Sequence, residues 1–223
     1  MNARTWLAAT CLIGAAVCAP AAQANTIVQF DTTLGAFDVS LDDGVAPATV
    51  ANFLSYVQQG AYDDTVVHRS VPGFVIQGGG YHGDFSSVAQ GAPIAYEQGL
   101  SNLRGTIAMA RTADLNSATS QWFINTVDNT SLDTAQYAAF GYVLGDGMKV
   151  VDAIAALPRY NLSNFAGGAF TDVPLHDVAG ATTFSPSFFV TMSVEVVPEP
   201  QTWMLMGLGL SALAFSARRT RPS

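Results

Sequence analysis

Apolar and polar residues alternate along two neighbouring stretches near the start of the chain, residues 26–31 and 35–41. Alternation with a period of two is typical of strands with one buried face, so these stretches predict a β-hairpin. The period then changes to that of a helix over residues 47–59, where Pro47 suits the first turn and Gly60 suits the position after the last turn. The chain therefore begins its fold with a hairpin followed by a helix.

The stretch 65–81 reads TVVHRSVPGFVIQGGGY, and it is broken in the middle by Pro72-Gly73. This pattern predicts two short strands joined by a tight turn. Further strands are expected over residues 106–111, 121–126, 138–144 and 188–197, and a second short helix over 148–157. Many strands, two helices and glycine-rich links together predict an antiparallel barrel or sandwich with helical caps, while residues 161–186 are expected to form an irregular surface segment.

The first 24 residues have Arg4 near their start, a long apolar run, and the ending Ala22-Gln23-Ala24. Small residues at these positions are typical of a signal-peptidase site, so residues 1–24 predict a signal peptide and Asn25 the mature start. A buried N-terminal helix is the alternative, although Pro20 and the small-residue ending fit it poorly.

The other end of the chain carries Pro198-Glu199-Pro200, an apolar run from residue 203 to 217, and a basic tail. The run is short for a membrane helix, which needs about 17–25 residues, and the arginines would remain cytoplasmic. Together these features resemble the PEP-CTERM sorting signal of Gram-negative bacteria, which implies processing by an exosortase. Residues 198–223 are therefore expected to be a sorting segment that contacts the membrane at least transiently; a plain single-pass anchor is the alternative.

Composition changes the picture in two respects. Both cysteines, Cys11 and Cys18, lie in the expected signal peptide, which excludes cysteine nucleophiles and cysteine-based metal sites from the mature domain. Residues 25–197 hold 16 acidic and five basic side chains, a net charge of −11. Such an acidic surface argues against binding of nucleic acid or anionic lipid headgroups.

Most patterns that would indicate a catalytic site are missing. The three histidines lack the spacing of a zinc site, and His68, set among valines, is more typical of a hydrogen-bonded core histidine. The paired acids at 42–43 and 63–64 are typical of solvated turns rather than of a glycosidase. What remains is Arg69 and Gln77, eight residues apart among large apolar side chains. They indicate either an apolar groove with two polar groups or a hairpin whose arginine points to water.

The run His68-Arg69-x-x-Pro72-Gly73-Phe74-x-Ile76-Gln77-Gly78-Gly79 resembles the signature of the cyclophilins, the peptidyl-prolyl cis-trans isomerases. Residues 117–125, SATSQWFIN, are similar to the segment that bacterial members carry there. Residues 140–143 and 147–152 match the next landmarks of the family in order. The resemblance extends from about residue 26 to residue 197, essentially the whole expected mature domain.

This resemblance implies a mainly β fold, an eight-stranded antiparallel barrel capped by two helices and flanked here by N- and C-terminal apolar helices. It implies that Arg69 is the catalytic arginine and Gln77 the glutamine beside it. The other site residues that it implies are Phe74, Phe123 and Leu132 in the proline pocket, Val75 and Tyr137 at its wall, and Ala110, Arg111 and Gln121 along the peptide backbone.

Three positions depart from the best-known members of the family. Ser131 stands where eukaryotic members often have tryptophan, Tyr137 where they have histidine, and Val75 where they have methionine. These differences leave sensitivity to cyclosporin and substrate preference open.

The expected function is therefore catalysis of X-Pro rotation, without metal or cofactor, during folding of exported proteins. The expected location is the periplasm, outer surface or extracellular matrix of a Gram-negative bacterium. Pro-containing polypeptides are the expected partners, together with an exosortase, and the domain is expected to be a monomer. Two alternatives stay open: a binding module that holds Pro-containing segments without turnover, and a structural surface or matrix protein.

Overall fold

The computed structural model describes residues 25–198. The predicted signal peptide and nearly all of the predicted sorting segment, with their apolar helices, lie outside the described residues. Among the helices that are described, none is long and apolar enough to span a membrane.

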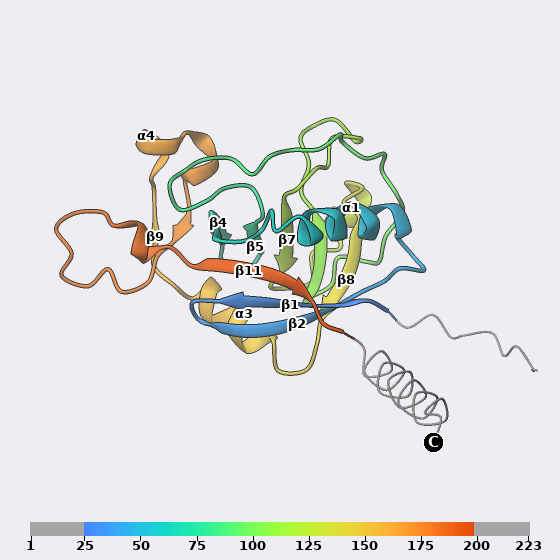
Figure 1. Cartoon of the computed structure of the whole chain (residues 1–223), viewed down its shortest axis with the longest axis horizontal. Coiled ribbons are helices and arrows are strands. Elements are labelled where there is room, and N and C mark those ends of the chain that lie inside the picture. Colours follow the sequence, from blue (N-terminus) through green and yellow to red (C-terminus); the bar gives the residue numbers. More distant parts are fainter. Residues whose placement is uncertain (1–24, 199–223) are drawn as a thin grey trace, which may run out of the picture.

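A single antiparallel sheet dominates the described part of the chain (Figure 1), which confirms the mainly β prediction. Its strands run in the spatial order β3-β11-β1-β2-β8-β6-β7-β5-β4. They are β1 (Ile27–Thr32), β2 (Gly35–Leu41), β3 (Thr65–Val66), β4 (Arg69–Val71), β5 (Val75–Gly78), β6 (Thr106–Met109), β7 (Trp122–Asn125), β8 (Ala139–Val143) and β11 (Thr191–Val196).

The sheet curls, so that its two edge strands, β3 and β4, come close together. β3 and β4 stand at opposite ends of the strand order, yet only residues 67 and 68 separate them along the chain. The backbone N–H of Val67 donates to the carbonyl of Val190 at 3.0 Å, which keeps this junction beside the segment leading into β11. The expected strand count of eight differs from the nine observed because the predicted strand over residues 65–71 is interrupted at this junction.

The two predicted helices are confirmed as α1 (Pro47–Gln58) and α3 (Met148–Ala155). The first turn of a helix leaves backbone N–H groups without partners, and no local side chain caps α1. Glu97 supplies this cap from a distant loop, because its carboxylate accepts from the backbone N–H of Thr49 at 2.9 Å and of Ala48 at 3.3 Å. A negative charge at this end of a helix is also favourable to the helix dipole.

Aromatic side chains fill the interior between the sheet and α1. Phe53 of α1 is fully buried, and its ring centroid lies 5.3 Å from those of Tyr62 and Phe140 and 6.2 Å from that of Phe30. Phe30 also meets the ring of Trp122 edge-on at 5.1 Å. This interlocked cluster connects the helix to strands from both halves of the sheet.

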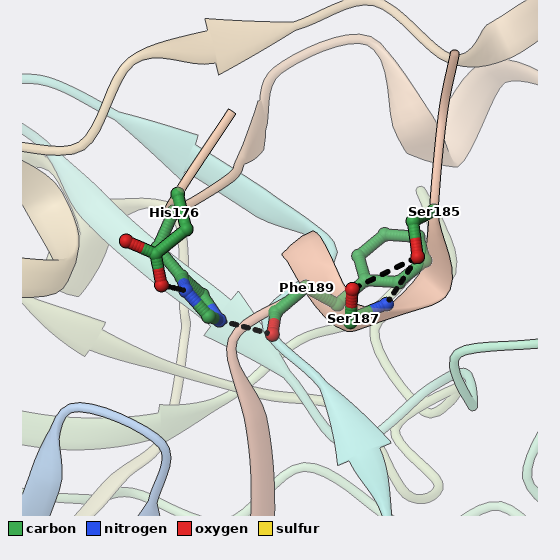
Figure 2. A network of polar contacts seen from close by, with 5 residues as sticks. His176, Ser185, Ser187 and Phe189 are labelled. Carbon is green, nitrogen blue, oxygen red and sulfur yellow. Dashed lines mark hydrogen bonds and ion pairs between the residues drawn. The ribbon is translucent and has the colours of Figure 1, made fainter. Parts of the chain in front are cut away.

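Residues 159–190 form a side lobe, drawn in orange at the left of Figure 1, in which the sequence predicts only irregular structure before the last strand. Its elements are β9 (Arg159–Tyr160), α4 (Ser163–Ala166), η1 (Gly168–Phe170), β10 (Val173–Pro174) and η2 (Pro186–Phe188). A second hydrophobic cluster, which includes Phe170 and Phe189, packs the lobe against Val66 of β3. Figure 2 shows a hydrogen bond within the lobe, in which His176 donates from Nε2 to the carbonyl of Phe189 at 3.1 Å.

The packing of Phe53 gives a stability prediction. Because Phe53→Ala leaves a cavity in a fully buried aromatic cluster, the free energy of unfolding should fall by about 3–5 kcal/mol. Phe165→Ala is the matched control, since that side chain lies in the lobe and is 70% exposed; its effect should stay within about 0.5 kcal/mol. Urea denaturation measures both, and equal losses for the two variants would contradict this account of the core.

Candidate active site

A row of side chains crosses four neighbouring strands on the outer face of the sheet. In the strand register Arg69 of β4 lies opposite Gln77 of β5, Gln77 lies opposite Phe123 of β7, and Phe123 lies opposite Ala108 of β6. The adjacent row, which includes Ile76 and Ile124, faces the barrel core instead. Because successive residues of a strand point to opposite faces, a one-residue slip of register would bury Arg69 and expose the core.

The turn between β4 and β5 sets this register. The N–H of Phe74 donates to the carbonyl of Val71 at 3.1 Å, and Gly73 has a φ of 63°. Proline at the second position of a turn and glycine with positive φ at the third are typical of a type II turn. The predicted Pro72-Gly73 hairpin is therefore confirmed, and it places Arg69 directly opposite Gln77.

A chain of side-chain hydrogen bonds orients the arginine. The Arg69 guanidinium donates from Nη1 to Oε1 of Gln77 at 3.2 Å, and Nε2 of Gln77 donates to Oε1 of Gln121 at 2.9 Å. Gly80 leaves room for this arrangement, since a Cβ there would lie 2.8–2.9 Å from atoms of the Gln121 side chain. The guanidinium is therefore held by an uncharged amide rather than by a carboxylate, and its full positive charge remains available to a ligand.

An apolar cavity of about 170 Å³ opens beside Arg69. Phe123, which is 5% exposed, forms its base, and the ring of Tyr137 meets that of Phe123 edge-on at a centroid distance of 5.7 Å. The cavity is lined by Arg69, Phe74, Val75, Gln77, Ala110, Arg111, Phe123, Leu132 and Tyr137. Its size and apolar lining suit a small ring, and the guanidinium supplies a polar group at its edge.

Leu132 and Tyr137 come from a loop that contains the short helix α2 (Ser131–Thr134), and a buried polar network fixes this loop. Asn102 donates from its backbone N–H to Asp133 at 2.7 Å and from its side-chain amide to the carbonyl of Tyr137 at 3.0 Å. Asn129 donates from its side chain to the carbonyl of Phe74 at 2.9 Å. Three separate segments of the cavity wall are therefore connected by amide groups.

The same network keeps the Asp133 carboxylate turned toward Asn102. Although burial acts to raise the pKa of Asp133, hydrogen bonds from Ser101 and Asn102 outweigh it, so the pKa lies below the usual value. The Asp133 carboxylate thus interacts with Ser101 and Asn102 rather than with the cavity.

Arg111 stands between the first cavity and a second one. Its guanidinium lies 4.5 Å from the ring centroid of Tyr137, and it donates to the carbonyl of Thr112 at 2.9 Å and to the carbonyl of Ala135. The second cavity also measures about 170 Å³, and it is lined by Gln77, Gln90, Ala110, Arg111, Thr112, Ser117, Thr119 and Gln121. The two cavities share Gln77, Ala110 and Arg111, so they lie side by side and together make up the groove.

The structure thus gathers all ten predicted site residues in one groove: nine line the first cavity, and Gln121 lines the second. The alternative in which Arg69 points into water is wrong, because its side chain lines the cavity and bonds to Gln77. Within residues 25–198, no group of three or more His, Cys, Asp or Glu side chains is placed to hold a metal ion.

Residues 27–178 match the family model described as cyclophilin type peptidyl-prolyl cis-trans isomerase/CLD, which covers well over half of the chain. The chain belongs to the cyclophilin family. Its cyclophilin domain is 44% identical over 160 residues to peptidyl-prolyl cis-trans isomerase A of Dickeya dadantii, an alignment that covers 69% of this chain and 81% of that protein.

A second relative is peptidyl-prolyl cis-trans isomerase B of Escherichia coli, 42% identical over 161 residues, covering 68% of this chain and 94% of that protein. Among solved structures, a cyclophilin of Cryptosporidium parvum shares the fold with a TM-score of 0.58 at 21% identity, covering 79% of this chain and 99% of that one. Residues 196–219 match the PEP-CTERM protein-sorting motif, which indicates that this cyclophilin is exported and sorted.

Sequence reasoning missed two sets of residues in or behind the cyclophilin groove. The amides of Asn102, Asn125 and Asn129 were assigned no role, because the partners that they join are up to 55 residues apart. The second cavity was not foreseen either. The SATSQ run could have indicated it, since Ser117 and Thr119 precede Gln121 on one loop.

His68 lies buried between β3 and β4, with its ring 5.0 Å from that of Tyr81. The predicted core position is confirmed, although Nδ1 has no hydrogen-bond partner among the described residues. Burial lowers the pKa of His68 to about 4, and the positive charge of Arg69 acts in the same direction. The ring is therefore neutral in the folded protein at physiological pH.

A pH dependence of stability follows. Between pH 6.5 and about 4 the unfolded chain binds a proton at this histidine and the folded chain does not. The free energy of unfolding should therefore fall as the pH is lowered through this window, by up to about 3 kcal/mol. His68→Gln should remove this part of the slope, as measured by urea denaturation from pH 4 to 7.5. Parallel pH curves for the variant and the unaltered protein would contradict the assignment.

Proposed function

We propose that this protein is a peptidyl-prolyl cis-trans isomerase in which Arg69 stabilises the twisted X-Pro bond. The observation that carries the proposal is a guanidinium held by an amide, Gln77, at the edge of an apolar cavity of about 170 Å³. The reaction needs no other chemistry, because no covalent bond is made or broken.

Resonance in the amide sets the barrier to rotation at ~18–20 kcal/mol, so X-Pro bonds isomerise in tens of seconds or longer. A catalyst accelerates this rotation only by stabilising the twisted state more than either planar form. Twisting breaks the resonance, and the proline nitrogen becomes pyramidal and gains a lone pair. A donor aimed at that nitrogen forms a hydrogen bond that exists only in the twisted state.

The groove supports these roles. Phe74, Phe123 and Leu132 grip the proline ring, and Val75 and Tyr137 complete the wall. Arg69 donates to the proline nitrogen, and the low dielectric of the cavity strengthens this contact. Gln77 holds both Arg69 and the carbonyl that precedes the proline. Ala110 and Arg111, which line both cavities, bind the peptide backbone together with Gln121 of the second cavity.

Replacing Arg69 tests this proposal. Arg69→Ala should lower kcat/KM for a Xaa-Pro peptide by at least about 100-fold while the fold is retained, because it removes a donor specific to the transition state. Arg69→Lys should also be poor, because an ammonium cannot reproduce the planar fork that Gln77 holds. Rates come from an assay coupled to chymotrypsin.

Arg159→Ala is the control, since Arg159 is an exposed cation in the side lobe, outside the groove. Equal kcat/KM for Arg69→Ala and the unaltered protein would refute the catalytic role. Peptide binding without any turnover by the unaltered protein would instead favour a module that only holds Pro-containing segments.

We further propose that residues 1–24 are a signal peptide, 25–197 a monomeric isomerase domain that assists folding of exported proteins, and 198–223 a segment processed by an exosortase. The match of residues 196–219 to the sorting motif supports the last of these boundaries. The clients would then be Pro-containing proteins of the periplasm, outer surface or matrix. A purely structural role at the surface is the competing reading, and turnover by the mature protein distinguishes the two.

Processing of the tail is tested by mass spectrometry of the exported protein. In a host that has the exosortase, the mature protein should begin near Asn25 and lack most of residues 198–223. In the same host without the exosortase, the tail should be retained. A protein that keeps its tail in both hosts would contradict the proposed processing.

A further inference from the structure

Two of the five basic side chains of the described domain lie in the groove, and neither has a carboxylate partner there. Among residues 25–198, Arg104 pairs with Asp152 at 2.6 Å and Lys149 pairs with Asp146 at 2.9 Å. Arg69 and Arg111 form no ion pair with any residue in this range. In a domain whose net charge is −11, two uncompensated cations in one groove create a local site of positive potential.

Arg111 is the cation that faces the second cavity. Its Nη1 and Nη2 donate to the backbone carbonyls of Thr112 and Ala135, while Nε is buried without a hydrogen-bond partner in the described part of the chain. The guanidinium also lies over the ring of Tyr137. Carbonyl oxygens and an aromatic face do not cancel a positive charge. Neutral groups therefore hold Arg111 in place, and its charge can attract an anionic side chain.

The carboxylates around Arg111 have other partners. Glu97 lines a further small cavity with Arg111, but its carboxylate accepts from the backbone N–H of Thr49 at 2.9 Å. The carboxylate of Asp114 is exposed and accepts from the backbone N–H of Asn116 at 2.9 Å. Asp133 accepts from Asn102. The rest of the lining beside Arg111 is polar but uncharged: Gln90, Thr112, Ser117, Thr119 and Gln121.

The direction of the bound peptide follows from the shared wall. With the proline ring in the first cavity and the preceding carbonyl at Gln77, the chain on the N-terminal side of the proline runs toward Ala110 and Arg111. Because Ala110 and Arg111 line both cavities, the residue two positions before the proline would then lie beside the second cavity. That cavity is as large as the one assigned to the proline ring, so it accommodates a full side chain.

We propose that this groove prefers substrates with an acidic residue, glutamate above all, two positions before the proline, and that Arg111 is the residue that selects it. The proposal rests on the proposed isomerase activity and names the substrate class of the same groove. Gln121, Thr119 and Ser117 supply the polar surroundings of the carboxylate, and Arg111 supplies the opposite charge.

Peptides that differ only at this position test the proposal. Three peptides Xaa-Ala-Pro-Phe, with Glu, Gln or Lys as Xaa, are compared by kcat/KM in the presence of excess chymotrypsin. At ~0.1 M salt the Debye length is about 10 Å, which screens the repulsion between an acidic peptide and the distant acids of the domain while leaving a direct contact effective. Glu should exceed Gln by about two- to five-fold, the range measured for partly exposed ion pairs, and Lys should be the poorest.

Raising the salt concentration and replacing Arg111 then test whether an ion pair with Arg111 causes the preference for Glu over Gln. The ratio of Glu to Gln should decrease toward one as salt is raised to 1 M, where the Debye length is about 3 Å. Arg111→Gln should bring the same ratio close to one at ~0.1 M salt, whatever it does to the absolute rates. Arg159→Gln is the matched control, because it removes one exposed charge outside the groove, and it should leave the ratio unchanged.

The outcomes are distinct. Equal kcat/KM for Glu, Gln and Lys peptides in an active unaltered protein overturns the acidic preference and leaves the isomerase function in place. A preference that survives in Arg111→Gln overturns the role of Arg111. Absence of turnover with all three peptides overturns the isomerase function itself. Should Arg111→Gln fold poorly, the salt dependence measured on the unaltered protein decides the electrostatic part of the proposal.

Discussion

The hydrogen bond from the Arg69 guanidinium to Gln77 is the interaction on which the rest of the groove depends. It exists because the two residues lie directly opposite each other in the β4–β5 register. An arginine side chain has many conformations, and fixing one in advance removes an entropic cost that would otherwise be incurred during the reaction. Because the partner is a neutral amide, the fixed guanidinium also keeps its charge for the substrate.

The curled sheet supports this arrangement. β4 would be a free edge in an open sheet, yet only two residues connect it to β3, which pairs with β11. The side lobe adds a further tie, because the N–H of Ser70 donates to the carbonyl of Asp172 at 2.8 Å. On the other side of the cavity, the amides of Asn102 and Asn129 hold the loop that carries Leu132 and Tyr137. The apolar walls and the polar group are thus fixed by separate sets of contacts.

Features that depend on near neighbours in sequence could be predicted. The β4–β5 turn follows from Pro72-Gly73, and the two helices follow from the spacing of their apolar residues. The gathering of the site residues was foreseen through the family resemblance and not through periodicity alone. Features that join distant segments could not be foreseen. Glu97 caps α1 from 48 residues away, and the strand expected over residues 65–71 is divided into β3, which pairs with β11, and β4, which pairs with β5. The short strands and helices of the side lobe were not predicted, because elements of two to four residues have no apolar period that a sequence pattern could show.

The central claim is that Arg69 reaches the proline nitrogen while the ring occupies the apolar cavity. A crystal structure of the domain with a bound Xaa-Pro peptide, or with an analogue locked near the twisted geometry, measures this directly. The account predicts the ring between Phe74, Phe123 and Leu132, with a guanidinium nitrogen within hydrogen-bonding distance, about 2.7–3.2 Å, of the proline nitrogen of the twisted analogue. A ring bound elsewhere, or a guanidinium turned away from that nitrogen into solvent, would contradict it.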